Sequence, residues 1–121
     1  MDMTTTTRQS GNVTIVDIKG RIVMGAETAA LRDAILDLLN KGHLQILLNL
    51  AGVDYIDSMG LGALVGASVT VRKQGGELKL LNVSNKVTDV MQITKLYTVF
   101  DIATDEASAV KSFAQSAAAK G

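Results

Sequence analysis

The chain has 121 residues, enough for one domain with a substantial core, and its 12 basic and 12 acidic residues cancel. This balance argues against a protein that neutralises many nucleic-acid phosphates. The absence of cysteine and the presence of one histidine exclude disulfides, thiolate metal sites and multi-histidine metal sites. No apolar run approaches the roughly 18 residues of a membrane span, and the N-terminus lacks a signal-peptide pattern. We therefore expect a cytoplasmic protein with no metal, cofactor, membrane or nucleic-acid partner.

The first third of the chain predicts a β-hairpin followed by a helix. Residues 4–9 are rich in threonine and residues 13–19 in strand-forming aliphatic side chains, with the turn signal Ser10-Gly11-Asn12 between them. Residues 4–9 fit either an edge strand or a frayed tail, and the hairpin is the interpretation that we favour. After a loop, leucine and isoleucine recur at helical spacing through Ala26–Asn40.

The remaining residues predict strands that alternate with helices. Apolar residues dominate one face of a strand at 44–50, and further strands are expected at 77–83 and 97–102. Helices are expected over 58–74, from Ser84 or Asn85, and from Thr104 onward. Strands that alternate with helices imply parallel pairing. The sequence thus predicts a single α/β domain over residues 1–121, with a mixed, mostly parallel sheet, an N-terminal β-hairpin and about four helices. Residues 1–3 and 116–121 are expected to form loose tails.

The junction between the third strand and the second helix concentrates the residues of interest. Asp57 and Ser58 are both good N-cap residues, because a short side-chain oxygen accepts from the free N–H groups of a first helical turn. Gly60, Gly62 and Gly66 follow, and each costs about 1 kcal/mol relative to alanine within a helix. Such a cost suggests that something approaches the helix closely. We favour internal packing for Gly66 and a presented site for Gly60 and Gly62.

A serine at such a junction also invites a hydrolase interpretation, which the sequence argues against. A nucleophile elbow needs glycine two residues before the serine, where this chain has Ile56. The only histidine, His43, precedes the strand at 44–50, so it lies on the order of 20 Å from Ser58 at about 3.3 Å per residue. A general base must lie within about 3 Å. The glycine spacing misses the nucleotide-binding patterns, and two nearby aspartates alone do not indicate a metal site. We expect no catalytic residue and no enzyme activity.

The run Asp57-Ser58-Met59-Gly60-Leu61-Gly62 resembles the signature of bacterial anti-sigma factor antagonists, the STAS domains. The resemblance continues through Gln74-Gly75-Gly76-Glu77-Leu78 and residues 96–100, and covers about residues 13–113. It implies that an anti-sigma factor, itself a serine kinase, phosphorylates Ser58. It further implies that only the unphosphorylated form binds that kinase and frees a sigma factor, and that a phosphoserine phosphatase restores this form.

The expected partner surface is the Ser58 end of the sheet, with residues 24–28 and 84–86 nearby. A helix N-terminus accommodates a phosphate, so we expect the modification to act on binding rather than on folding. The predicted partner-binding residues are Asp54, Asp57, Met59, Gly60, Leu61 and Gly62.

Two departures from the resemblance leave the function open between two classes. Met59 stands where family members often have a second serine, and Arg21-Ile22-Val23 stands where they often have acidic residues. One class is the phosphorylation-switched antagonist. The alternative is a constitutive STAS scaffold or subunit, in a stress-signalling or lipid-transport assembly, that is never phosphorylated. The sequence does not indicate the oligomeric state.

Overall fold

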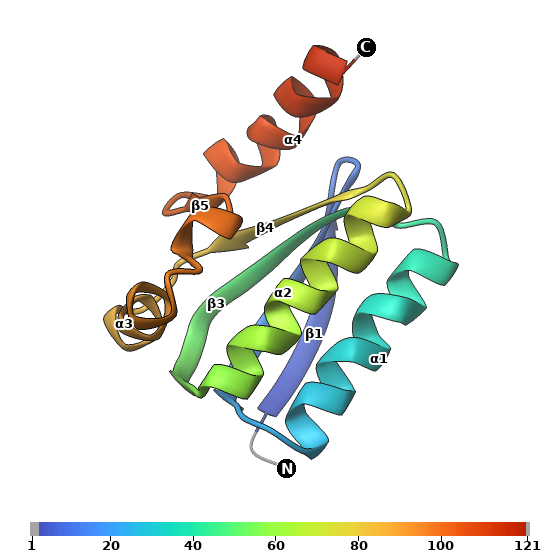
Figure 1. Ribbon diagram of the computed structural model, residues 1–121. Coiled ribbons are helices and arrows are strands. Elements are labelled where there is room, and N and C mark those ends of the chain that lie inside the picture. The colour runs from blue at the N-terminus through green and yellow to red at the C-terminus, as the bar shows by residue number, and fades with distance from the viewer. Residues whose placement is uncertain (1–2, 121) are drawn as a thin grey trace.

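A computed structural model describes the backbone of residues 3–120 and the side chains of residues 3–113. In this part of the chain one five-stranded sheet has the strand order β1-β2-β3-β4-β5, with four α-helices around it (Figure 1). β1 pairs antiparallel with β2, and the other neighbouring strands are parallel. The predicted α/β fold is therefore confirmed. The elements in chain order are β1 (Met3–Ser10), β2 (Val13–Ile22), α1 (Ala26–Asn40), β3 (Gln45–Ile56), α2 (Ser58–Lys73), β4 (Glu77–Leu81), α3 (Asn85–Thr94), the 3-10 helix η1 (Tyr97–Val99), β5 (Ile102–Ala103) and α4 (Glu106–Lys120).

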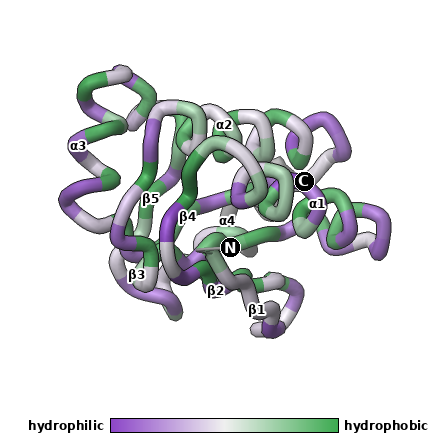
Figure 2. Tube along the Cα trace, turned by 90° about the horizontal axis from the view of Figure 1, so that it is seen from below, coloured by the Kyte–Doolittle hydropathy of each residue, from purple (hydrophilic) through white to green (hydrophobic). Residues whose placement is uncertain are grey.

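The main hydrophobic core lies between one face of the sheet and the helices α1, α2 and α3. Successive side chains of a strand point to opposite faces, so alternate residues such as Ile46, Leu48 and Leu50 of β3 enter this core together. Leu31 of α1 and Leu64 of α2 pack against them and are fully buried. Figure 2 shows hydrophilic residues on the outer sides of α1 and α3. Burial of one face and exposure of the other set the rotation of each helix about its own axis.

A smaller core lies on the opposite face of the sheet, beneath α4. Ile15 and Leu47 from the central strands pack against Phe113 of α4. The buried Lys79 of β4 reinforces this contact, because its Nζ donates to Ser112 Oγ at 2.8 Å and lies 4.9 Å from the centre of the Phe113 ring. One apolar patch and one buried cation thus hold α4 to the sheet.

Arg8 joins β1, β2 and α4 through two carboxylates. Its Nε donates to Asp17 Oδ2 at 2.7 Å and its Nη1 donates to Glu106 Oε2 at 2.9 Å. Asn49 Nδ2 also donates to Asp17 Oδ1, at 2.7 Å. The hydrogen bonds from Arg8 hold the pKa of both carboxyls below the ordinary range, and the two carboxylates raise the pKa of Arg8. The network stabilises the fold only while both carboxyls are ionised.

The Arg8 network gives a prediction about acid stability. A carboxyl whose pKa is lower in the folded state stabilises the fold above its unfolded pKa of about 4, and that contribution is lost as the pH falls through the folded value. Urea unfolding should show wild type more stable than Arg8→Met at pH 7, by at most about 1 kcal/mol because the pairs are partly exposed. The difference should vanish near pH 2. A difference that persists there would assign the effect of Arg8 to packing instead of charge.

Some element boundaries differ from those that the sequence predicts. Met3, expected in a loose tail, begins β1 and is 1% exposed, because its side chain reaches the main core. β3 continues from the expected end at Leu50 to Ile56, since its pairing with β2 resumes after a register shift. The predicted strand at 97–102 is wrong: η1 occupies its first half, and of these six residues only Ile102 belongs to a strand, β5. α4 remains helical to Lys120, past the expected start of a loose tail.

Candidate functional site

Asp57 is the N-cap of α2, which decides between the two candidates that the sequence leaves open. Its Oδ1 accepts a hydrogen bond from the backbone N–H of Gly60 at 2.6 Å. Its Oδ2 accepts from the backbone N–H of Met24 at 3.2 Å, and its own N–H donates to the carbonyl of Ile22 at 3.3 Å. One residue therefore fixes both the start of α2 and the loop between β2 and α1.

Ser58 is the first residue of α2, and its side chain is exposed. Its hydroxyl makes no hydrogen bond within the part of the chain whose side chains the structure describes. Since Asp57 provides the cap, the hydroxyl of Ser58 is not needed to start the helix. The first N–H groups of a helix have no intrahelical partner and lie at the positive end of its dipole. A negative group attached to Ser58 would therefore meet unpaired donors in the free domain.

Two of the three glycines of α2, Gly60 and Gly66, have surroundings opposite to those expected, whereas Gly62 is exposed as a presented residue would be. A Cβ on Gly60 would collide with the carbonyl oxygen of Ile22 and lie 2.8 Å from its carbonyl carbon. Gly60 is therefore required for packing α2 on the end of β2. By contrast, a Cβ on Gly62 or Gly66 would have no other atom within 4 Å, so internal packing does not explain either residue.

Two of the six predicted partner-binding residues are corrected by their burial. Leu61 is 0% exposed in the main core, and Gly60 is buried against β2, so neither offers a surface to a partner. The others remain accessible at this end of the molecule: Asp57 is half-buried, and Asp54, Met59 and Gly62 are exposed.

Met24 adds a second exposed apolar side chain beside Ser58. Met24 is 66% exposed and Met59 is 57% exposed, and the hydrogen bond to Asp57 holds the Met24 backbone at the start of α2. For Met24 this agrees with the expectation that residues 24–28 lie nearby. Methionine is flexible and polarisable, which suits a surface that contacts another protein. The two methionines provide apolar contact area around a hydroxyl that is free.

Sequence reasoning missed a contact between Arg21 and Tyr55. The guanidinium of Arg21 lies 5.0 Å from the centre of the Tyr55 ring, a cation–π arrangement on paired positions of β2 and β3. The sequence suggested that Arg21 belonged to a loop. The parallel register of β2 and β3 was the missing information, because it places two residues far apart in the chain directly side by side.

His43 and Ser58 lie at opposite ends of β3. His43 precedes β3, and its Nδ1 lies 3.4 Å from Gln9 Nε2, whereas Ser58 follows the other end of the same strand. Among the described residues, no group of three or more histidine, cysteine, aspartate or glutamate side chains could hold a metal ion. In the same part of the chain, no helix has both the length and the apolar character needed to cross a membrane.

Comparison with known proteins relates this geometry to a family. The family model of the STAS domain matches residues 4–109. The anti-sigma-B factor antagonist of Bacillus subtilis (strain 168) is 35% identical over 102 residues, which cover 84% of this chain and 92% of that protein.

Solved structures share the fold at lower sequence identity. An anti-sigma factor antagonist from Mycobacterium paratuberculosis superposes with a TM-score of 0.77 at 20% identity, over 92% of this chain and 93% of that one. The phosphorylated form of the Bacillus cell fate determinant SpoIIAA superposes with a TM-score of 0.68 at 19% identity, over 89% of this chain and 97% of that one. These likenesses concern the fold alone.

Proposed function

Because this chain belongs to the STAS domain family, we propose that it is an anti-sigma factor antagonist whose binding is switched at Ser58. The unphosphorylated chain binds an anti-sigma factor that is a serine kinase, and so frees a sigma factor. Phosphorylation of Ser58 abolishes binding, and a phosphoserine phosphatase restores it. The similarity to the Bacillus subtilis antagonist over most of both chains supports the choice of function. The chain acts as a regulator and does not itself carry out catalysis.

The observation that carries this proposal is the free hydroxyl of Ser58. It is exposed at the start of α2, while the neighbouring Asp57 carries the whole capping role. A kinase can therefore reach the hydroxyl. Phosphorylation of this hydroxyl removes no hydrogen bond on which the fold depends. A residue whose side chain capped the helix would be a poorer acceptor, because its modification would disturb the start of the helix.

The surface around Ser58 also suits a switch that acts on a complex. Met24 and Met59 supply exposed apolar area for a partner. A phosphate on Ser58 brings a charge of about −1.5 to −2 next to the carboxylate of Asp57. In the free domain water and the first N–H groups of α2 solvate this charge. Under a bound partner the same charge must lose water, which costs several kcal/mol unless a cation compensates it.

The first test of the proposal is the site of phosphorylation. The anti-sigma factors encoded in the same genome would each be purified and incubated with ATP and this chain. With the cognate kinase, intact-mass analysis should show one phosphate on the wild type and none on Ser58→Ala. Fragmentation should place the phosphate on Ser58, and the alanine variant should still bind the kinase.

The exposed Ser108 near the start of α4 offers a control in the same chain. Its backbone N–H donates to Asp105 Oδ2 at 2.9 Å, which places this serine in the first turn of another helix. The Ser108→Ala variant should therefore be phosphorylated like wild type. Phosphate at Thr28 or Ser84 would show that another hydroxyl is the acceptor. Binding to an anti-sigma factor without any phosphorylation would favour the constitutive scaffold.

A further inference from the structure

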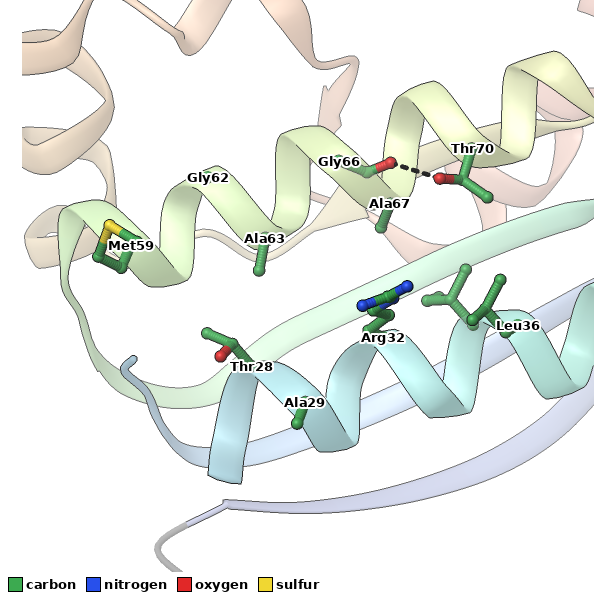
Figure 3. Close-up of a pocket in the computed structure, with 11 residues that line it drawn as sticks. Thr28, Ala29, Arg32, Leu36, Met59, Gly62, Ala63, Gly66, Ala67 and Thr70 are labelled. Carbon is green, nitrogen blue, oxygen red and sulfur yellow. Dashed lines mark hydrogen bonds between the residues drawn. The ribbon is translucent and has the colours of Figure 1, made fainter. Parts of the chain in front are cut away.

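A groove of about 710 Å³ runs between α1 and α2 and opens beside the candidate site. Met59 lines one end of it and Thr70 the other, so it follows α2 for about three helical turns. Figure 3 shows the alanines of α2 facing α1 across this space. Since Met59 directly follows Ser58, the groove is continuous with the phosphoacceptor surface.

Four small residues of α2 line the groove, and the fold leaves room for a larger side chain at two of them. Gly62 and Gly66 line it one helical turn apart, and each has open space where a Cβ would stand. Ala63 and Ala67 lie beside them on the same helix. Glycine weakens a helix interior, and packing against the described residues does not require it at these two positions. These two glycines leave room for another molecule to approach the helix closely.

Among the polar side chains that line the groove, Arg32 is the one available to bind a partner. The hydroxyl of Thr28 donates to the carbonyl of Gly25 at 3.0 Å, and that of Thr70 donates to the carbonyl of Gly66 at 2.9 Å, so both donors are used internally. Arg32 extends from α1 toward α2 (Figure 3), and its guanidinium has no ion-pair partner among the described residues. An otherwise apolar groove thus carries one unpaired positive charge near its middle.

We propose that this groove binds an amphipathic helix of the anti-sigma factor, which presents an apolar face and one carboxylate that pairs with Arg32. The inference rests on the proposed function and adds a second contact surface to it. A helix of about three turns matches the length of the groove, and the small residues of α2 let its backbone come close. A partner helix seated here ends next to Ser58, where a phosphate opposes it.

The test compares the affinity of the purified cognate anti-sigma factor for groove variants and matched controls by calorimetry. Arg32→Glu places a like charge opposite the expected carboxylate, and Gly66→Leu adds bulk to the groove at a position where its Cβ would meet open space. Each should weaken binding about tenfold or more. Arg72→Glu and Val69→Leu, at exposed positions of α2 outside the groove, should bind within about twofold of wild type. Thermal unfolding of every variant checks that it is folded.

Cross-linking identifies the occupant, because a chain without cysteine allows a single reactive site at Thr70→Cys. A photo-reactive label there should cross-link to one helix of the anti-sigma factor that has apolar residues at helical spacing and an aspartate or glutamate among them. Cross-links to a loop, or between two copies of this chain, would overturn the inference.

The outcomes separate this inference from the function beneath it. If the anti-sigma factor binds wild type and Ser58→Asp weakens that binding, but the groove variants bind like wild type, only the groove assignment fails. If no anti-sigma factor binds wild type, the proposed function fails and the groove assignment fails with it.

Discussion

The Gly60→Ala variant should lose about 2–3 kcal/mol of folding free energy, although alanine is the better helix former. Helix propensity alone would favour the alanine by about 1 kcal/mol. The added Cβ, however, collides with the carbonyl oxygen of Ile22 and lies 3.0 Å from Cγ1 of Ile56. A main-chain carbonyl in a paired strand cannot move aside as a flexible side chain can, so the cost should lie at or above the upper end of the about 1–3 kcal/mol that overpacking typically carries. The collision therefore outweighs the propensity.

Two glycines of the same helix provide the control for this prediction. Gly62→Ala and Gly66→Ala meet no atom within 4 Å, so each should stabilise the free domain by up to about 1 kcal/mol. Urea unfolding followed by circular dichroism measures all three variants under the same conditions. Equal stability of Gly60→Ala and Gly62→Ala would contradict the close packing of α2 against the end of β2. Failure of Gly60→Ala to fold would agree with it.

Phosphorylation of Ser58 should weaken binding to the anti-sigma factor by about 100-fold or more. The dianion must lose water beneath the partner, next to the carboxylate of Asp57, and an uncompensated buried charge costs several kcal/mol. Because about 1.4 kcal/mol corresponds to a tenfold change in affinity, even part of that penalty yields the expected loss. Ser58→Asp should reproduce the loss only in part, since it carries less charge and fewer acceptor oxygens.

The same modification should leave the domain almost unchanged. The phosphate meets free N–H groups at the start of α2, and the Asp57 cap to Gly60 stays in place, so no rearrangement is needed to accommodate it. Amide chemical shifts of the free domain should move only around residues 54–62 and the loop near Met24. Shifts spread across the sheet and α4 would show that the switch is conformational and would refute a local electrostatic mechanism.

The local pattern of the sequence was sufficient for the class of fold and for the choice of Ser58 as the candidate acceptor. Alternating apolar residues define the inner strands, helical spacing defines α1, and the turn at Gly11 defines the hairpin. Each of these signals extends over a few residues, so it can be recognised without knowledge of the rest of the chain. The exposure of Ser58 follows in the same way, since a polar residue at a strand-to-helix junction lies at the surface.

Only the tertiary structure decided which residues around Ser58 face solvent. Gly60 packs internally because the carbonyl group of Ile22, on another strand, lies against it. The sequence around α2 does not contain this information, since Ile22 is distant in the chain. The packing of α2 on the sheet therefore buries Gly60 and Leu61, and it leaves Gly62 and Gly66 open to the groove beside α1. Helical periodicity predicts which residues of α2 share a face. The packing of the helix on β2 and β3 determines which of these faces is buried.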